Sequence, residues 1–371
     1  MSGWNGIFYN GVFCCGFDFL PTGTPTVGGV FDSVGSTPTI GSTYAHVSGY
    51  GIQCNGNQVY LGKALHVNLA SMYLGVAYEC VTLPTGSVQN FIATFYDSTA
   101  GAPQLTVAVN NQGQIGFYRG GNGFPSYGSL GTLVGSLSAA GTIVAGSYNY
   151  LEFFVTISGT LGVVTCNVNG TQVINATAQN TQSTANAYTN YIYFGSSTTT
   201  GTGANQYFDD LYALDTTGSA PFNTFLGAGR IQTDGPSADS ATSGLNAWSY
   251  TTPPGTDYGC CDNIPANSAE YCYDSNVGDR MSFRFPSLST AKVFFLNTWY
   301  LAEIDASGTR TIVPIFRNNS VDQVGPSPNS LGTTYTYYNQ PSTVDPNTGT
   351  AWASETVATA AACEIGLKVN S

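Results

Sequence analysis

The chain has 371 residues, which is enough for two domains, and only 8% of its residues are charged. Its net charge is −12, and the acidic excess is shared by both halves, so neither half offers the basic face that a nucleic-acid backbone needs. Glycine (45), tyrosine (24) and phenylalanine (20) are abundant. This composition favours a folded, all-β chain of short strands and tight turns over a disordered or helical chain.

The start of the chain does not resemble a secretory signal peptide. No cationic residue precedes the first apolar residues, and glycines and Asp18 interrupt the apolar run. No stretch approaches the roughly 18 uninterrupted apolar residues of a membrane-spanning helix, so we expect no membrane span. Synthesis in a cytoplasm is the expectation that follows.

The first part of the chain predicts an antiparallel β-sandwich. Segments that alternate apolar and polar residues, or that are rich in β-branched and aromatic residues, follow one another between turn-forming residues. They are 49–54, 59–61, 72–80, 88–96, 104–118 with a hinge at 110–113, 148–157, 163–174, 191–194 and 207–214. Within 163–174, Asn169 and Gly170 predict a type I′ hairpin, because both central residues of that turn need a positive φ.

Residues 216–229 predict a linker, because Pro221 and several glycines punctuate this segment. We therefore expect a first domain over 1–215 and a second, C-terminal β-sandwich domain over 230–371. The second domain has strand-like segments at 280–285, 292–301 and 309–316. Residues 357–363 fit a helical turn and a strand equally well.

Several of these segments carry recurrent motifs. In the first part they are the hairpin at 105–115, the strand Tyr148-Asn-Tyr-Leu-Glu-Phe153, the hairpin at 168–170 and Phe208-Asp-Asp-Leu-Tyr212. They continue with Asn223-Thr-Phe-Leu-Gly-Ala-Gly-Arg230 and Asp345-Pro-Asn-Thr-Gly-Thr-Ala-Trp352. The series resembles bacteriophage virion structural proteins that begin with a laminin-G-like (concanavalin-like) jelly roll. The resemblance spans nearly the whole chain, and the departures from it are 119–128, 257–275 and Cys14–Cys15.

The resemblance implies two β-sandwich domains, the first of them a laminin-G-like jelly roll. It also implies a non-enzymatic virion protein on the particle exterior, as capsid decoration or as a neck, tail or fibre component. Such a protein would be made in the host cytoplasm and would act through contacts with other virion proteins. A homo-oligomer, most plausibly a trimer, is the assembly that we expect from the symmetry of phage appendages.

The residues give little support for catalysis. No nucleophile elbow, phosphate loop or dinucleotide fingerprint is present in the sequence. His46 and His66 lie in strand-like surroundings that favour a structural role. Asp209 and Asp210 are adjacent on a predicted strand, so we expect them to face opposite sides instead of forming a glycosidase pair. Glu152 is expected on a sheet face, and a buried acid is the alternative.

We expect no metal and no other cofactor. The nine cysteines lack the Cys-x-x-Cys spacing of zinc sites. Buried, reduced thiols are one interpretation, and disulfides formed after release among Cys260, Cys261 and Cys272 are the other. Calcium held by Asp97 and by Asp209 or Asp210 is an alternative, although their spacing does not form a loop with alternating oxygen ligands.

A glycine-rich segment suggests a second function, that of a host-glycan adhesin. Sugar binding uses aromatic platforms and a few polar groups. Tyr118, Arg119, Asn122 and Tyr127 would supply such groups on a loop facing the glycan. The alternative is an ordinary hairpin loop that packs on a neighbouring strand. Substituting Tyr118, Arg119 and Tyr127 separates the two interpretations, because only an adhesin would lose adsorption.

Overall fold

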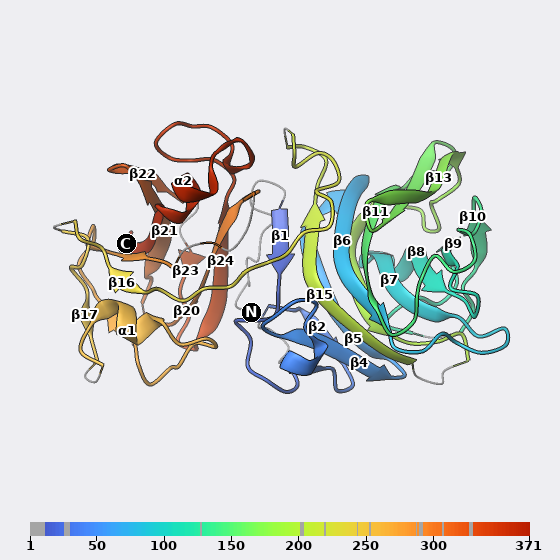
Figure 1. The fold of residues 1–371 in the computed structure, drawn as a ribbon, viewed down its shortest axis with the longest axis horizontal. Helices are drawn as coiled ribbons and strands as arrows, with labels where there is room; N and C mark the ends of the chain where they lie inside the picture. The colour runs from blue at the N-terminus through green and yellow to red at the C-terminus, as the bar shows by residue number, and fades with distance from the viewer. Residues whose placement is uncertain are drawn as a thin grey trace. The chain divides into compact units, whose positions relative to one another are not determined.

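A computed structural model describes most of the chain. The described residues are 12–25, 30–126, 128–200, 204–218, 220–242, 244–251, 254–286, 288, 292–305, 308–325 and 329–371. The described chain divides into two compact units, with the boundary between Ile231 and Gln232. Almost all regular structure is β, and every strand pairing of the described residues is antiparallel (Figure 1).

One sheet of the first unit has eight strands, in the order β13-β12-β11-β6-β15-β4-β3, with β1 paired to β15. Their bounds are β1 Val12–Cys15, β3 Thr39–Gly41, β4 Gly51–Gly56, β6 Ser71–Cys80, β11 Tyr148–Thr156, β12 Gly162–Val168, β13 Thr171–Gln179 and β15 Ala204–Leu214. A 3₁₀ turn, Ser42–Tyr44, joins β3 to β4.

The second sheet of this unit has seven strands, in the order β10-β9-β8-β7-β14-β5-β2. Their bounds are β2 Ser33–Gly35, β5 Val59–Leu69, β7 Asn90–Asp97, β8 Ala102–Val109, β9 Ile115–Arg119, β10 Thr132–Val134 and β14 Thr189–Ser196. The chain passes repeatedly from one sheet to the other, for example from β4 to β5, from β5 to β6, from β6 to β7 and from β14 to β15, as in a jelly roll.

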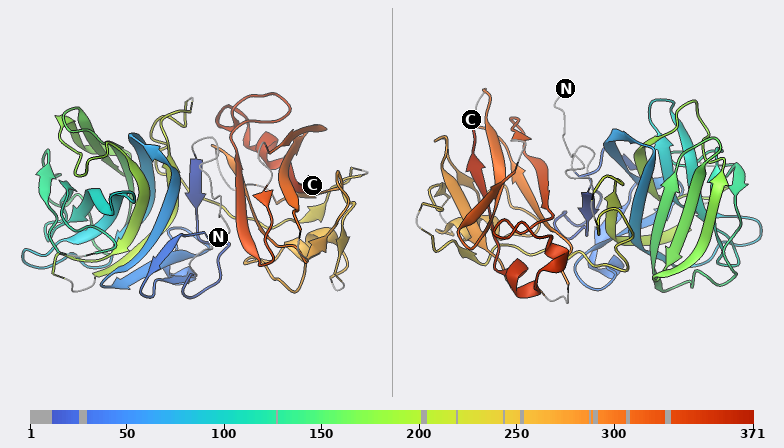
Figure 2. Two further views of the ribbon diagram at one scale, coloured as in Figure 1. Left: turned by 180° about the vertical axis from the view of Figure 1, so that it is seen from behind. Right: turned by 90° about the horizontal axis from the view of Figure 1, so that it is seen from above.

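The core of the first unit lies between these two sheets, which form two layers (Figure 2). Phe117 of one sheet and Phe153 of the other have ring centroids 5.8 Å apart. Phe194 and Phe208 make a second contact across the layers, at 5.6 Å. Such interdigitation of inward-facing side chains holds a β-sandwich together. The predicted sandwich fold of this unit is confirmed.

The predicted hairpin at Asn169 and Gly170 is also confirmed. These residues join β12 to β13 and have φ values of 49° and 77°. The segment expected as a linker, 216–229, packs on the first unit. There the Gly227 N–H donates to Glu152 Oε1 at 2.8 Å, and the Leu226 N–H donates to the Tyr212 hydroxyl at 3.3 Å.

The second unit is a smaller β-sandwich. Its six-stranded sheet has the order β16-β19-β25-β21-β22, with β23 paired to β21. The bounds are β16 Ala238–Asp239, β19 Arg280–Arg284, β21 Thr311–Asn318, β22 Val321–Val324, β23 Asn329–Ser330 and β25 Glu364–Val369. Two-stranded sheets are formed by β17 Ser249–Tyr250 with β18 Cys272–Tyr273, and by β20 Leu296–Ala302 with β24 Thr336–Ser342. Tyr300 and Ala302 of β20 pack on the buried cluster that contains Trp248, Phe283 and Leu367.

Helices are short and few among the described residues. They are α1 Asp257–Cys261 and α2 Val357–Ala361, with a 3₁₀ turn at Trp352–Ser354. The segment 357–363, which the sequence left open, is thus helical over most of its length. In the described part of the chain, no helix has the length and apolar character needed to cross a membrane.

Candidate functional site

Four tyrosines lie together on one face of the seven-stranded sheet, and we call them the tyrosine shelf. They are Tyr60 of β5, Tyr96 of β7, and Tyr191 and Tyr193 of β14. Tyr191 and Tyr193 share a face because alternate residues of a strand point the same way. Tyr96 is the register partner of Tyr191, and Tyr60 lies on the neighbouring strand opposite Gly195. The sheet register therefore gathers side chains that are far apart in sequence.

Tyr193 is the centre of the shelf. Its ring stacks on that of Tyr191, with centroids 4.6 Å apart and an interplanar angle of 30°. Tyr60 and Tyr96 approach it edge to face, at 5.4 Å and 5.3 Å. Tyr193 itself is only 8% exposed, whereas the three tyrosines around it are half-buried. Edge-to-face and offset contacts of this kind fix ring orientation, so the shelf is a preorganised aromatic surface.

Glycines beneath the rings make this arrangement feasible. A Cβ atom at Gly62 would lie 2.6 Å from Tyr193 Cε1 and 2.7 Å from Tyr191 Cε1. A Cβ atom at Gly35 would lie 2.2 Å from Tyr60 Cε1. Real Cβ atoms do not approach other atoms so closely, so the rings lie over backbone that only glycine leaves open.

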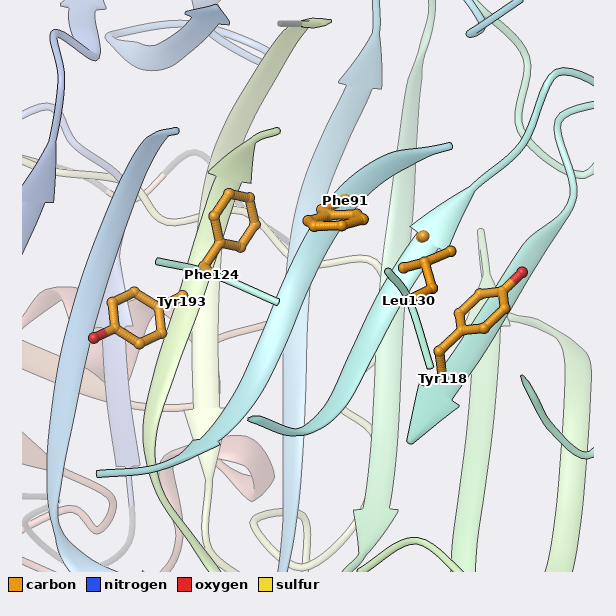
Figure 3. Packing of buried hydrophobic residues seen from close by; sticks show 6 residues of the cluster. Phe91, Tyr118, Phe124, Leu130 and Tyr193 are labelled. Atoms are coloured by element: carbon orange, nitrogen blue, oxygen red, sulfur yellow. The ribbon is translucent and has the colours of Figure 1, made fainter. Parts of the chain in front are cut away.

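A loop between β9 and β10 borders the shelf. Figure 3 shows Phe91, Phe124, Leu130, Tyr118 and Tyr193 on one face of the sheet. The ring of Phe124 lies 5.8 Å from that of Tyr60 and 5.9 Å from that of Phe91, and its N–H donates to Thr94 Oγ1 at 3.2 Å. The loop therefore covers part of this face and contacts the tyrosine shelf at Tyr60.

The residues expected to face a glycan are distributed differently from the prediction. Tyr118 is only 7% exposed, and its hydroxyl donates to Gln89 Oε1 at 2.8 Å, so it belongs to the covered part of the face. Arg119 is half-buried at the end of β9, next in sequence to Tyr118 and hence directed away from it. Asn122 is exposed in the loop, and Tyr127 lies outside the described residues. Tyr118 therefore fits the alternative interpretation, in which this segment packs on neighbouring strands and does not face a glycan.

The shelf is uncharged, and its surroundings offer little positive charge. Burial, followed by Tyr193 and Asp32, raises the pKa of Tyr191, and burial, followed by Tyr96 and Tyr60, raises the pKa of Tyr193. Both phenols therefore stay neutral hydrogen-bonding groups at physiological pH. Residues 11–231 contain three cations, of which fully buried Lys63 pairs with Asp32 at 3.0 Å and Arg230 bonds to Ser48. Arg119 stands on β9, which is separated from β14 by β8 and β7.

A second polar cluster corrects the prediction for Asp209 and Asp210. These carboxylates do not face opposite sides, because β15 has a bulge here and Asp210 has a φ of 49°. Both are 3% exposed, and both bind His46: the backbone N–H of His46 donates to Asp209 Oδ2, and its ring Nδ1 contacts Asp210 Oδ2, each at 2.8 Å. Burial and the charge of Asp210 raise the pKa of Asp209 to about 9. The cluster fastens the segment around His46 to β15.

Two other acids are engaged by protein donors. Glu152 is a buried acid, 1% exposed, and accepts bonds from the Tyr212 hydroxyl at 2.5 Å and the Gly227 N–H at 2.8 Å. Asp97, a candidate calcium ligand, accepts bonds from the hydroxyl of Thr184 and the side chain of Asn186, and from two backbone N–H groups. Across the described ranges, no group of three or more His, Cys, Asp or Glu side chains is arranged to hold a metal ion.

One sequence signal points to the shelf, although the sequence predictions did not include these tyrosines. The Tyr-x-Tyr pattern at 191–193 within a predicted strand places both rings on one face. Gly62 and Gly35 fall in other strands, and only the register of β14, β5 and β2 brings them beneath the rings.

Comparison with known proteins gives weak likenesses. No protein-family model matches the chain, and no curated protein matches its sequence. Among solved structures, the cellulose-induced protein Cip1 is similar at 15% identity and a TM-score of 0.36, over 62% of this chain and 97% of that protein. The alginate lyase Aly36B is similar at 13% identity and a TM-score of 0.35, over 55% and 97% of the two chains. Sheep galectin-11 gives 12% identity and a TM-score of 0.28, over 43% and 98%. Values this low carry no information on the activity of this chain.

Proposed function

We propose that this chain is a non-enzymatic bacteriophage virion protein on the particle exterior that binds a neutral carbohydrate of the host surface through the tyrosine shelf. The observation that carries the binding function is the set of four tyrosines in mutual ring contact on one sheet face, three of which lie over glycines. Flat aromatic faces stack on the apolar faces of sugar rings, and phenol hydroxyls bond to sugar hydroxyls.

A neutral sugar fits the charge distribution better than an acidic one. Lys63 is buried and bound to Asp32, which lies near Tyr191, and the chain as a whole is acidic. A carboxylated sugar placed on the shelf would gain no ion pair from Lys63, because that cation is fully buried and already paired with Asp32. We therefore expect neutral hexose or N-acetylhexosamine oligosaccharides to bind in preference to sialylated or uronate-containing ones.

A glycan array probed with the purified, labelled protein tests this proposal. Tyr96→Ala and Tyr191→Ala should each lower binding by at least about tenfold, which corresponds to about 1.4 kcal/mol. Tyr207→Ala is the matched control, because Tyr207 is also a half-buried strand tyrosine in ring contact with another tyrosine, at 5.0 Å, but belongs to the other sheet. Equal loss in all three variants, or none in any, would contradict the proposal.

The virion setting is tested independently by immunogold labelling of intact particles with antibody to this chain. We expect gold on the particle, over the head or at one vertex or along the tail. Absence of label on infectious particles would overturn the virion assignment while leaving the sugar-binding test intact.

A second candidate function is docking to other virion proteins through protein contacts alone. It is favoured by exposed aromatic residues on and beside the paired strands β17 and β18 of the second unit, where Tyr250, Tyr271 and Tyr273 are 38%, 44% and 53% exposed. Exposed tyrosines are typical of protein interfaces. Particle assembly that depends on these residues, combined with a silent glycan array, would favour this candidate.

A further inference from the structure

A pair of thiols in the second unit is positioned for chemistry that the proposed function does not use. The Sγ atoms of Cys261 and Cys272 lie 3.7 Å apart. Cys261 ends α1, and Cys272 begins β18, where it pairs with Tyr250 of β17. A disulfide bond is about 2.05 Å long, so an approach of less than 2 Å, within reach of side-chain rotation, would join them.

We propose that Cys261 and Cys272 form a disulfide when the protein meets an oxidising environment, and that this bond clips α1 to the two-stranded sheet of β17 and β18. Both cysteines are half-buried and thus open to a small-molecule oxidant. In the reducing cytoplasm in which we expect synthesis the pair stays as thiols, and outside the cell it closes.

The surroundings of the neighbouring Cys260 exclude it from the proposed disulfide. It is only 4% exposed, and its thiol contacts Thr251 Oγ1 and the Thr251 carbonyl, each at 3.5 Å. The remaining six cysteines are buried. Of the adjacent pair Cys260 and Cys261, therefore, only Cys261 is half-buried and in contact with Cys272, whereas Cys260 is packed in the interior.

The reaction balances with a low-molecular-weight disulfide such as oxidised glutathione. The thiolate of one cysteine attacks the glutathione disulfide, which forms a mixed disulfide and releases one glutathione thiol. The second cysteine, as its thiolate, then attacks the mixed disulfide and releases another. Two protein thiols are oxidised to one disulfide, and one glutathione disulfide is reduced to two thiols.

The clip would close a short loop, 262–271, that contains the exposed Ile264. A disulfide lowers the conformational entropy of the unfolded chain, and this one would also tether the strand that carries Tyr273. The clip lies in the second unit and shares no residue with the tyrosine shelf.

The test is to expose the full-length native protein to oxidised glutathione, quench with acid and count thiols after denaturation. The sequence holds nine thiols, and we expect two to be lost, with the disulfide mapped by mass spectrometry to a peptide joining Cys261 to Cys272. Cys260→Ser is the control and should still lose two. Cys261→Ser and Cys272→Ser should form no intramolecular bond and only add glutathione.

The thermal unfolding midpoint of the wild-type protein should rise by several degrees on oxidation and return on reduction, and should not rise in Cys261→Ser. The proposal is overturned if the mapped bond involves Cys260 or any buried cysteine. It is also overturned if all nine thiols persist in glutathione disulfide that fully oxidises a dithiol peptide under the same conditions.

Discussion

Gly62 illustrates, at the scale of single residues, how a missing side chain shapes the candidate site. Its place on β5 lies opposite Tyr193 on β14, so the aromatic ring extends over the glycine. The sequence predicted strands here and could not predict this contact, because the contact depends on the register of two strands more than a hundred residues apart.

Gly62→Ala should disturb the tyrosine shelf. The added Cβ would meet Tyr193 and Tyr191 at 2.6 and 2.7 Å, so both rings must move, and overpacking of this kind costs about 1–3 kcal/mol. We expect a lower unfolding free energy in denaturant titrations and weaker sugar binding. Gly159→Ala is the control, because its Cβ would meet only Gln182 Oε1 at 3.6 Å. Unchanged binding in Gly62→Ala would contradict the role of the ring arrangement.

The buried carboxylate Asp209 should give the first unit a pH-dependent stability. Its pKa is raised from 3.8 to about 9 by burial and Asp210, so the folded state holds a proton that the unfolded state releases. The stabilisation is complete below about pH 4 and is lost as pH rises towards 9, by at most about 1.4 kcal/mol per pH unit. Asp209→Asn cannot titrate and should flatten this slope, measured by denaturant unfolding at pH 5, 7 and 9. Parallel slopes in wild type and variant would refute the shift.

At the scale of elements, the glycine-rich loop between β9 and β10 packs on one face of the seven-stranded sheet. The sequence identified this segment as unusual and placed its tyrosines near a glycan. The buried side of the loop instead depends on Phe124 and Leu130, which enter the cluster that also contains Phe91. A loop sequence carries no period from which the inward-facing residues can be predicted.

Phe124→Ala should loosen this cover. Phe124 is fully buried, and truncation of a buried phenylalanine typically costs about 3–5 kcal/mol. We expect a lower midpoint for the first unit in thermal unfolding, with greater protease sensitivity of the loop. Ser126→Ala, an exposed position in the same loop, should behave as wild type. A Phe124→Ala protein as stable as wild type would show that the loop does not hold the face closed.

The hairpin at Asn169 and Gly170 was predicted correctly, because the turn type depends on these two residues themselves. The prediction for β15 was wrong, because strand alternation does not reveal a bulge. Alternation predicted Asp209 and Asp210 on opposite sides. The left-handed φ of Asp210 turns both carboxylates towards His46, which lies more than 160 residues away in sequence. The residues of the strand itself therefore cannot reveal that His46 is the partner of both carboxylates.

At the scale of the molecule, composition and strand spacing predicted the all-β class and the sandwich of the first unit, because turn residues and alternation recur along the chain. The function could not be predicted from the sequence to the same extent. Folds of this kind host many activities, and the motifs that resemble phage structural proteins are folding motifs.

Self-association is a further expectation at this scale. We propose a symmetric homo-oligomer, specifically a trimer, as in phage appendages. Gel filtration with light scattering should give a mass close to three times the 38.8 kDa of the chain. A monomer across a wide concentration range would contradict it.

The most direct test of sugar binding at the tyrosine shelf is ¹⁹F NMR of the full-length protein labelled with 3-fluorotyrosine, titrated with neutral oligosaccharides. Single tyrosine-to-phenylalanine variants assign the resonances. The account predicts that the signals of Tyr60, Tyr96 and Tyr191 shift with saturation, while that of Tyr207 stays in place. Shifts confined to tyrosines outside the shelf, or no shift with any neutral or acidic oligosaccharide, would contradict it.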